Sequence, residues 1–184
     1  MSHRPQGASF AQRTAWRAVP RHRPRQRAKE VFRDDTDRFH FLELLSELGE
    51  RFGATVLACV LMDNHYHLML ETPEANLSRA MHWLNAGDCV WLNRRHRRRG
   101  HLLQGRFGAF IVEEDAGWQE VARYIRLNPV RVGRLKLDNS ARAAAGAGLA
   151  SGPEAELAAA RLRALRGFGW SSYPGYAGYG PALS

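Results

Sequence analysis

The chain has 184 residues, of which 45% are hydrophobic, so it is long enough to form one domain with a sizeable core. Its 27 Lys and Arg residues outnumber 18 Asp and Glu residues, which gives a formal net charge of +9. No apolar run approaches the ~20 residues of a membrane span, and no apolar segment follows the basic N-terminus, so we expect a cytoplasmic protein without a membrane partner. Cys59 and Cys89 lie in apolar stretches and are expected to be small core residues.

The positive charge favours a nucleic-acid partner. Arginine supplies nearly all of it, and the planar guanidinium group suits phosphate better than the ammonium group of lysine does. A genome rich in arginine codons would produce the same composition, so charge alone leaves both explanations open.

The first half of the chain predicts a helix followed by two strands. Residues 1–30 hold Arg, Pro and His with little periodicity, which is typical of disordered sequence. A helix is predicted over 31–53, with Phe39, Leu42, Leu45 and Leu48 on one face and acidic residues as caps. A strand over 54–64 ends in an Asp63–Asn64 turn, and a second strand follows over 66–72.

The second half continues with a helix over 76–96, a basic loop over 94–100 and a strand over 101–115. A helix over 118–133 is broken by Pro129. The Ala/Gly-rich remainder contains one predicted helix, at 153–167, before a Tyr/Gly/Pro segment that we expect to be a loop.

This order of elements predicts an α+β fold. A small antiparallel sheet with helices packed on one side fits it, and the ferredoxin-like or RRM-like arrangement is the commonest such solution. We expect a poorly patterned N-terminus over 1–30, a central domain over 31–134, and a helical extension with a Tyr/Gly/Pro tail over 135–184.

Two histidines open the second predicted strand. Residues two apart in a strand point to the same face, so His65 and His67 direct their imidazoles together while Tyr66 points away. Paired imidazoles on one strand are half of a divalent-metal site. Solvent-facing histidines on a half-exposed sheet would show the same spacing, so this motif alone leaves both interpretations open.

A second candidate group lies on the helix predicted at 118–133. Tyr124 and Asn128 are four residues apart and so share one helix face. A tyrosine hydroxyl is a possible nucleophile, and an amide oxygen is a hard metal ligand. A core tyrosine and a helix end before Pro129 explain the same residues without any chemistry.

The blocks VLMDNHYHLMLETPEANLSRAMHWLN, RRHRRRGHLLQGRF and RYIRLNPVRVG resemble the single-tyrosine HUH transposases, which carry an IS200-like transposase domain. The similarity is greatest to the REP-associated tyrosine transposase branch. It runs from about Val31 to Gly133, with a further echo in WSSYPGYAG near the C-terminus.

The resemblance implies an enzyme that cleaves and rejoins single-stranded DNA at palindromic hairpins. Tyr124 matches the family's nucleophile, which forms a 5′-phosphotyrosine intermediate and releases a 3′-hydroxyl. His65 and His67 match the HUH motif that holds Mg²⁺ or Mn²⁺, and Asn128 matches the position of a further ligand. We therefore expect transposition and DNA recombination by a nucleoid-associated protein that acts as a monomer or a homodimer.

Arginines near these blocks are the predicted DNA contacts. In the family's arrangement one run lies beside the HUH face and another group flanks the nucleophile. These residues are Arg94, Arg95, Arg97, Arg98 and Arg99, and then Arg106, Arg123, Arg126 and Arg131. A solvated basic loop is the alternative for the first run. Trp83 and Trp91 are expected to be core residues rather than platforms for DNA bases.

The N-terminus departs from the family pattern. Relatives open with a strand beside the HUH strand, whereas residues 1–30 look like the product of a reading-frame shift. We therefore expect a sheet that lacks one strand and a catalytically impaired enzyme. A DNA-binding remnant without catalysis is the alternative function, and an unrelated metal hydrolase with water as nucleophile is a third. The hydrolase would tolerate loss of the Tyr124 hydroxyl, but its usual third histidine or carboxylate is missing at the expected spacing.

Overall fold

The computed structural model describes residues 12–18, 30–98, 108–112, 117–131, 135 and 155–179. Its elements, in chain order, are β1 (Gln12–Ala18), α1 (Asp35–Phe52), β2 (Thr55–Met62), β3 (His65–Thr72), α2 (Leu77–Arg95), β4 (Gly108–Ile111), α3 (Gly117–Arg126), the 3₁₀ turn η1 (Asn128–Val130), α5 (Ala155–Gly167) and α6 (Tyr173–Tyr176). The α+β class predicted from the sequence is confirmed.

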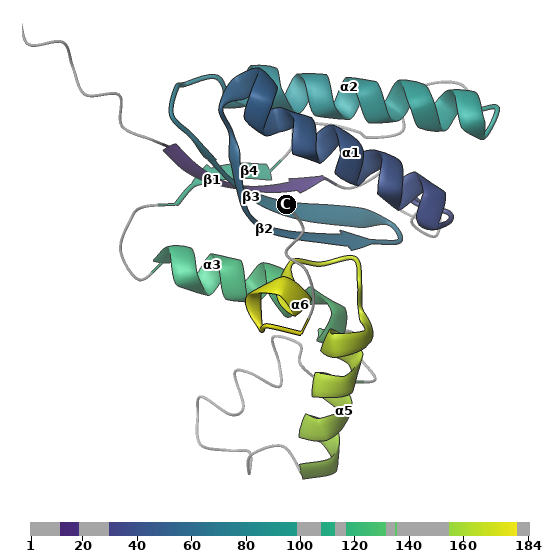
Figure 1. Ribbon diagram of the computed structural model, residues 1–184, viewed down its shortest axis with the longest axis vertical. Helices are drawn as coiled ribbons and strands as arrows, with labels where there is room; N and C mark the ends of the chain where they lie inside the picture. Colours follow the sequence, from purple (N-terminus) through teal and green to yellow (C-terminus); the bar gives the residue numbers. More distant parts are fainter. Residues whose placement is uncertain are drawn as a thin grey trace, which may run out of the picture.

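The four strands form one antiparallel sheet in the order β2-β3-β1-β4 (Figure 1). The predicted hairpin is present, because β2 and β3 pair from Thr55 opposite Glu71 to Met62 opposite His65. Asp63 and Asn64 form the turn between them, as expected. The strand predicted over 101–115 is described only at β4 and Val112.

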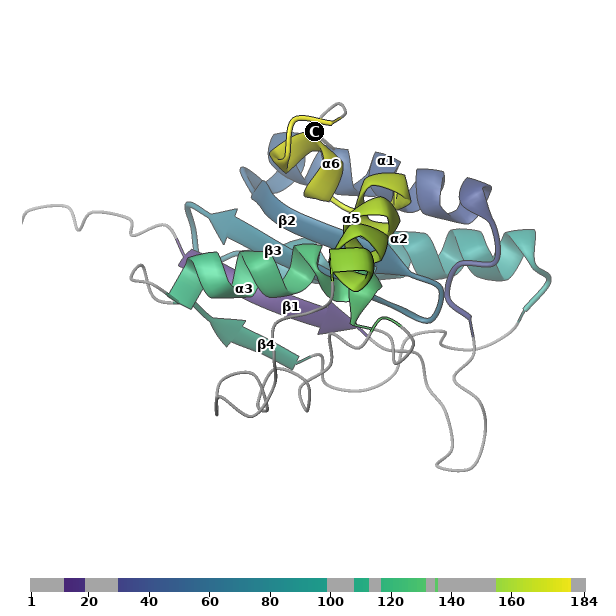
Figure 2. The same ribbon diagram turned by 90° about the horizontal axis from the view of Figure 1, so that it is seen from below.

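Helices cover both faces of the sheet, which corrects the prediction that they would lie on one side. Helices α1 and α2 lie on one face, and α3 lies across the other (Figures 1 and 2). The cause is visible in β3, where Tyr66 and Leu68 enter the core beneath α1 and α2, while Met69 joins Ala122 and Ile125 of α3. Both faces of this central strand are apolar, so both need a helix.

Strand β1 corrects the expectation that the sheet lacks its N-terminal strand. Residues Gln12–Ala18 pair with β3 from Gln12 opposite Thr72 to Ala18 opposite Tyr66, and they also pair with β4. The strand therefore lies between β3 and β4, where the sheet would otherwise be interrupted. The rest of the predicted disordered N-terminus, apart from Glu30, lies outside the described residues.

Helix α1 begins and ends at clear signals. The Asp34 carboxylate accepts a hydrogen bond from the backbone N–H of Asp37 at 3.1 Å, as an N-cap does. At the other end Gly53 adopts φ +65°, a left-handed conformation that favours glycine. The buried face carries Leu45 and Leu48 as predicted, but Phe39 is 59% exposed.

The C-terminal segment covers the outer edge of β2. The backbone N–H of Leu61 donates to the carbonyl oxygen of Trp170 at 2.8 Å, and that of Ser172 donates to the carbonyl of Cys59 at 3.0 Å. The Trp170 ring packs edge-on against Phe39, with 5.0 Å between ring centroids, so this exposed phenylalanine of α1 has a packing partner in the C-terminal segment. The segment predicted to be a loop thus contains a β-bridge and the short helix α6.

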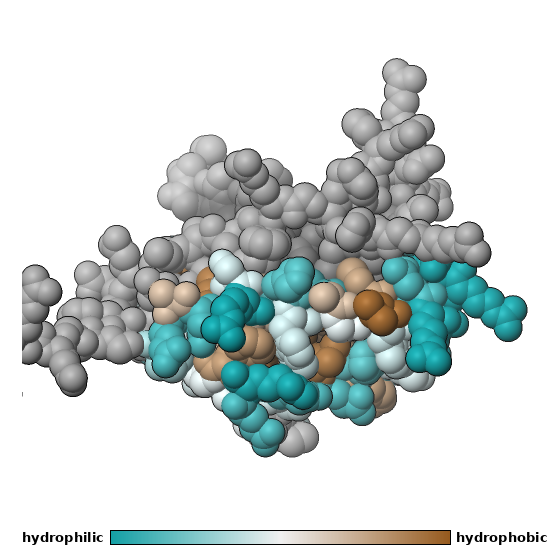
Figure 3. Space-filling model, turned by 90° about the horizontal axis from the view of Figure 1, so that it is seen from above, coloured by the Kyte–Doolittle hydropathy of each residue, from teal (hydrophilic) through white to brown (hydrophobic). Residues whose placement is uncertain are grey.

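The surface above α1 and α2 mixes hydrophilic and hydrophobic side chains (Figure 3). Val90 of α2 is 68% exposed, whereas Met81 and Leu84 of the same helix are buried. Cys59 is buried, and burial raises the pKa of its thiol to about 12. The thiol therefore stays protonated, which agrees with the predicted role as a small core residue. Among the helices that the structure describes, none is long and apolar enough to cross a membrane.

Candidate active site

Strand β3 holds His65 and His67 on the face that α3 covers. Their ring centroids are 5.1 Å apart and the rings are perpendicular. His67 is buried at 5% exposure and His65 is partly buried. The prediction that these imidazoles share one face follows from strand geometry, and the structure bears it out.

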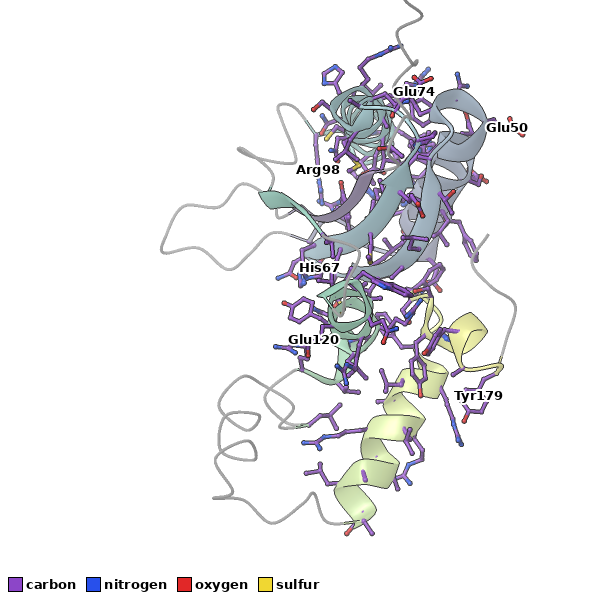
Figure 4. The ribbon with its side chains drawn as sticks, turned by 90° about the vertical axis from the view of Figure 1, so that its left-hand side faces the viewer. Glu50, His67, Glu74, Arg98, Glu120 and Tyr179 are labelled. Atoms are coloured by element: carbon purple, nitrogen blue, oxygen red, sulfur yellow. The ribbon has the colours of Figure 1, made fainter. Side chains whose placement is uncertain are left out.

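Tyr124 of α3 lies against His67. The two ring centroids are 5.6 Å apart, with the rings perpendicular, and the Tyr124 side chain stays 36% exposed. Figure 4 labels His67 on the side of the sheet next to α3. Two residues far apart in the sequence are thus brought together, with Tyr124 partly exposed and His67 buried beside it.

The position of Tyr124 follows from how α3 packs. Ala122 and Ile125 are buried against Val60 of β2 and Met69 of β3. Successive residues on a helix are about 100° apart, so burial of these two turns Tyr124 toward the flank of the sheet where His67 lies. The hydrophobic contact therefore sets where the phenol ring is presented.

Asn128 follows α3 in the 3₁₀ turn η1 and is buried, with 8% exposure. Two imidazoles and one amide oxygen are a donor set that Mg²⁺ or Mn²⁺ accepts, so the residue types fit the implied cation. Within the described ranges no group of three or more His, Cys, Asp or Glu side chains could hold a metal.

Arg131 stacks on the nucleophile candidate. Its guanidinium carbon lies 4.3 Å from the centroid of the Tyr124 ring, and its backbone N–H donates to the carbonyl of Asn128 at 3.0 Å. The stack restrains the phenol ring and places a positive charge beside it. Arg123, also predicted to contact DNA, is exposed and pairs with Glu120 at 3.2 Å.

Arg126 is engaged inside the protein. Its guanidinium donates to the carbonyl oxygen of Leu57 at 3.0 Å and lies 4.0 Å from the centroid of the Tyr176 ring. Burial lowers the pKa of this arginine below its ordinary value. In the sequence Arg126 looks like a DNA contact beside Tyr124, but the structure places it between β2 and the C-terminal segment.

Arg95 also forms ion pairs within the protein. Its guanidinium forms an ion pair with Asp34 at 2.9 Å and another with the buried carboxylate of Asp37. The hydrogen bond to Asp34 raises the pKa of Arg95, and the bond from Arg95 lowers the pKa of Asp34. These ion pairs join the end of α2 to the start of α1, and Arg95 also stacks on Trp91.

The other basic residues differ in exposure. Arg94 and Arg97 are exposed, whereas Arg98 is partly buried and its guanidinium approaches the carbonyl of Glu30 at 3.5 Å. Figure 4 labels Arg98 well apart from Tyr179. Two predicted DNA contacts, Arg99 and Arg106, lie outside the described residues.

The two tryptophans predicted to be core residues are partly buried. Trp83 packs against Phe52 with 5.9 Å between ring centroids, and Trp91 stacks on His40 with 4.1 Å between centroids. Both rings therefore pack against neighbouring side chains of the same chain, as expected.

Asn64 contacts one of the candidate ligands, which the sequence alone did not reveal. Its side-chain oxygen lies 2.6 Å from Nδ1 of His65, although its sequence position predicts only a turn. The sequence shows an amide side chain next to a candidate metal ligand, but asparagine is also common in turns because its side chain bonds to the local backbone.

Comparison with known proteins gives a family match. The family model described as "Transposase IS200 like" matches residues 22–128, which is more than half of the chain. A solved structure of a REP-associated tyrosine transposase bound to a REP hairpin aligns with a TM-score of 0.54 and 16% identity, over 82% of this chain and 89% of that one. This likeness shows a shared fold.

A solved structure of a protein classed as a transposase from Deinococcus radiodurans R1 aligns with a TM-score of 0.42 and 15% identity, over 68% of this chain and 95% of that one. A search of curated proteins found no match.

Proposed function

The chain belongs to the IS200-like transposase family, and we propose that it cleaves and rejoins single-stranded DNA through a covalent link to Tyr124. The observation that carries this proposal is the perpendicular contact between Tyr124 and His67, with 5.6 Å between ring centroids. A nucleophile beside a pair of imidazoles, with its ring partly open to solvent, is what attack on a phosphodiester needs.

In the proposed reaction the Tyr124 hydroxyl oxygen attacks the scissile phosphorus and loses its proton. A bond from phosphorus to the tyrosine oxygen forms, and the bond to the 3′-oxygen breaks. The departing 3′-oxygen takes up a proton, so the products are a 5′-phosphotyrosine and a 3′-hydroxyl. Attack by another 3′-hydroxyl reverses these steps and rejoins the strand, and no nucleotide hydrolysis is required.

The imidazoles of His65 and His67, together with the Asn128 amide oxygen, are the proposed ligands of Mg²⁺ or Mn²⁺. When bound, the cation polarises a phosphate oxygen and stabilises the negative charge that develops there. Arg131 would hold the Tyr124 ring in place for attack, because its guanidinium stacks on that ring.

Hairpin DNA is the proposed substrate, and palindromic repeats are its proposed source. The related fold solved with a REP hairpin supports this choice, as does the net charge of +9. Of the basic residues, the exposed Arg94, Arg97 and Arg123 are the best-placed described candidates for phosphate contacts. We place the protein on nucleoid DNA, as a monomer or a homodimer.

The test uses a labelled single-stranded hairpin incubated with the purified chain and Mn²⁺, followed by a denaturing gel. We expect a covalent protein–DNA band that disappears in Tyr124→Phe and with a chelator. Tyr179→Phe is the matched control, because it removes a hydroxyl from another exposed tyrosine and should leave the band intact.

Two outcomes would overturn the proposal. A native-gel shift without any covalent band would identify a DNA-binding protein without catalysis. Cleavage that persists in Tyr124→Phe would identify water as the nucleophile and a metal hydrolase. The DNA-binding alternative was predicted from the poorly patterned N-terminus, in which β1 supplies the strand that was expected to be missing.

A further inference from the structure

Asn64 and His65 are in direct contact at the start of β3. The side-chain oxygen Oδ1 of Asn64 lies 2.6 Å from Nδ1 of His65. An amide oxygen accepts hydrogen bonds and never donates them, so this contact is a hydrogen bond when Nδ1 carries the proton. A neutral imidazole has one N–H and one lone pair, and the lone pair of His65 then lies on Nε2.

We propose that Asn64 is a positioning residue that selects this tautomer of His65 and so presents Nε2 as the metal-binding nitrogen. The inference rests on the proposed function, in which His65 is a ligand. Histidines that bind metals usually donate their other ring N–H to an oxygen acceptor, which orients the ring and raises its basicity. The Asn64 amide oxygen is placed to be such an acceptor for His65.

The turn that carries Asn64 is firmly held. The carbonyl oxygen of the preceding residue, Asp63, accepts the backbone N–H groups of Val31 at 2.7 Å and Phe32 at 3.1 Å. Both of these residues are buried in the core beneath α1 and α2. A turn tied to a packed core keeps the Asn64 amide at a fixed position relative to β3.

A charged contact holds the same turn from the side. The guanidinium of Arg38, on α1, donates to the Asp63 carboxylate at 2.5 Å, and only 11% of the Arg38 side chain is exposed. The Arg38 guanidinium also lies 5.5 Å from the centroid of the Trp170 ring. Helix α1 therefore holds the residue that precedes Asn64, and Trp170 of the C-terminal segment packs on the arginine that does so, which favours a preorganised amide acceptor.

The geometry also assigns the two histidines different supports. The rings of His65 and His67 are perpendicular, so a shared cation requires each ring to be held at its own angle. His67 lies within β3, packs against Tyr124 and is 5% exposed, whereas His65 is the first residue of β3 and is more exposed. Packing restrains the first ring, and the Asn64 hydrogen bond restrains the second.

The experiment compares wild type with Asn64→Leu, which keeps the size of the side chain and removes the acceptor, and with Asn64→Asp, which restores an oxygen. Imidazole nitrogen NMR at about pH 8, where an unperturbed imidazole is neutral, reports the tautomer without any metal. We expect the Nδ1–H form of His65 in wild type and Asn64→Asp, and a shift toward Nε2–H in Asn64→Leu.

Titration with Mn²⁺ alone, followed by electron paramagnetic resonance, gives the second readout. We expect Asn64→Leu to bind about 10- to 100-fold more weakly, the usual effect of losing such a support, and Asn64→Asp to recover wild-type affinity. Circular dichroism and a thermal melt verify that each variant is folded. His67→Ala serves as the reference for a lost ligand.

The results separate failure of the inference from failure of the proposed function. Wild-type Mn²⁺ binding that His67→Ala abolishes but Asn64→Leu leaves unchanged would overturn the inference alone. An unchanged His65 tautomer in Asn64→Leu would also overturn it. A wild type that binds no Mn²⁺ and forms no covalent DNA adduct would overturn both.

Discussion

Asp88 carries a prediction about stability that is independent of catalysis. It lies on the inner face of α2 with 0% exposure, and neither of its carboxylate oxygens has a hydrogen-bond partner among the residues that the structure describes. Burial, and to a lesser extent the charge of Asp37, raises the pKa of Asp88 to about 8 from an ordinary value of 3.8. The folded protein therefore keeps a proton on Asp88 that the unfolded chain releases.

The sign of the pH dependence follows from that difference. Stability that is present below about pH 4 is lost as the pH rises, and the loss is complete above about pH 8. The full shift corresponds to at most about 6 kcal/mol, at about 1.4 kcal/mol for each pKa unit. Because a buried carboxylate draws in water and relaxes its surroundings, we expect about 2–4 kcal/mol between pH 5 and pH 8.

Asp88→Asn tests this reasoning, because the amide has nearly the same shape and stays neutral. Relative to wild type, the variant should gain about 2–4 kcal/mol of unfolding free energy between about pH 5 and pH 8. Urea titrations followed by tryptophan fluorescence at each pH measure this. Glu50→Gln, at an exposed position on α1, is the matched control and should show no such gain. A difference between Asp88→Asn and wild type that stays constant with pH would refute the reasoning.

Three further substitutions have defined outcomes. Gly53→Ala should lower the free energy of unfolding by about 1–2 kcal/mol in urea titrations, because φ is +65° and the new Cβ would lie 3.2 Å from the Pro73 ring. An unchanged free energy of unfolding would contradict a left-handed cap. Trp170→Ala should lower the free energy of unfolding by about 2 kcal/mol in the same assay, because the packing on Phe39 is lost. An unchanged free energy of unfolding would mean that the C-terminal segment does not pack against α1. Arg94→Gln should weaken hairpin binding and reduce the magnitude of its slope against log salt by about 0.7, measured by fluorescence anisotropy, whereas an unchanged slope would remove Arg94 from the DNA contacts.

The hairpin and its histidines were predictable because their signals are local. A period of two and a short turn define β2, β3 and the shared face of His65 and His67. The proximity of Tyr124 was predicted only through the family resemblance, because no local pattern tells which sheet face a helix covers. The structure supplies that face through the burial of Ala122 and Ile125.

The remaining features depend on contacts distant in sequence. Strand β1 was missed because QRTAWRA has few β-branched residues, and its pairing on both sides is decided by the backbone of β3 and β4. Arg126 looked like its arginine neighbours until the fold placed Leu57 and Tyr176 against it. Composition cannot show which arginines have protein partners.

The position of the C-terminal segment in the sequence also determines when the edge of β2 can be covered during synthesis. Its contacts with Cys59 join residues 113 positions apart, so β2 leaves the ribosome long before the residues that cover its edge. At a usual translation rate of about 5–20 residues per second, that interval is roughly 6–23 s. For this time the backbone groups of β2 that later bind Trp170 and Ser172 stay open to pairing with other chains. The nascent protein is therefore exposed to aggregation through the edge of β2 until the C-terminal segment covers it.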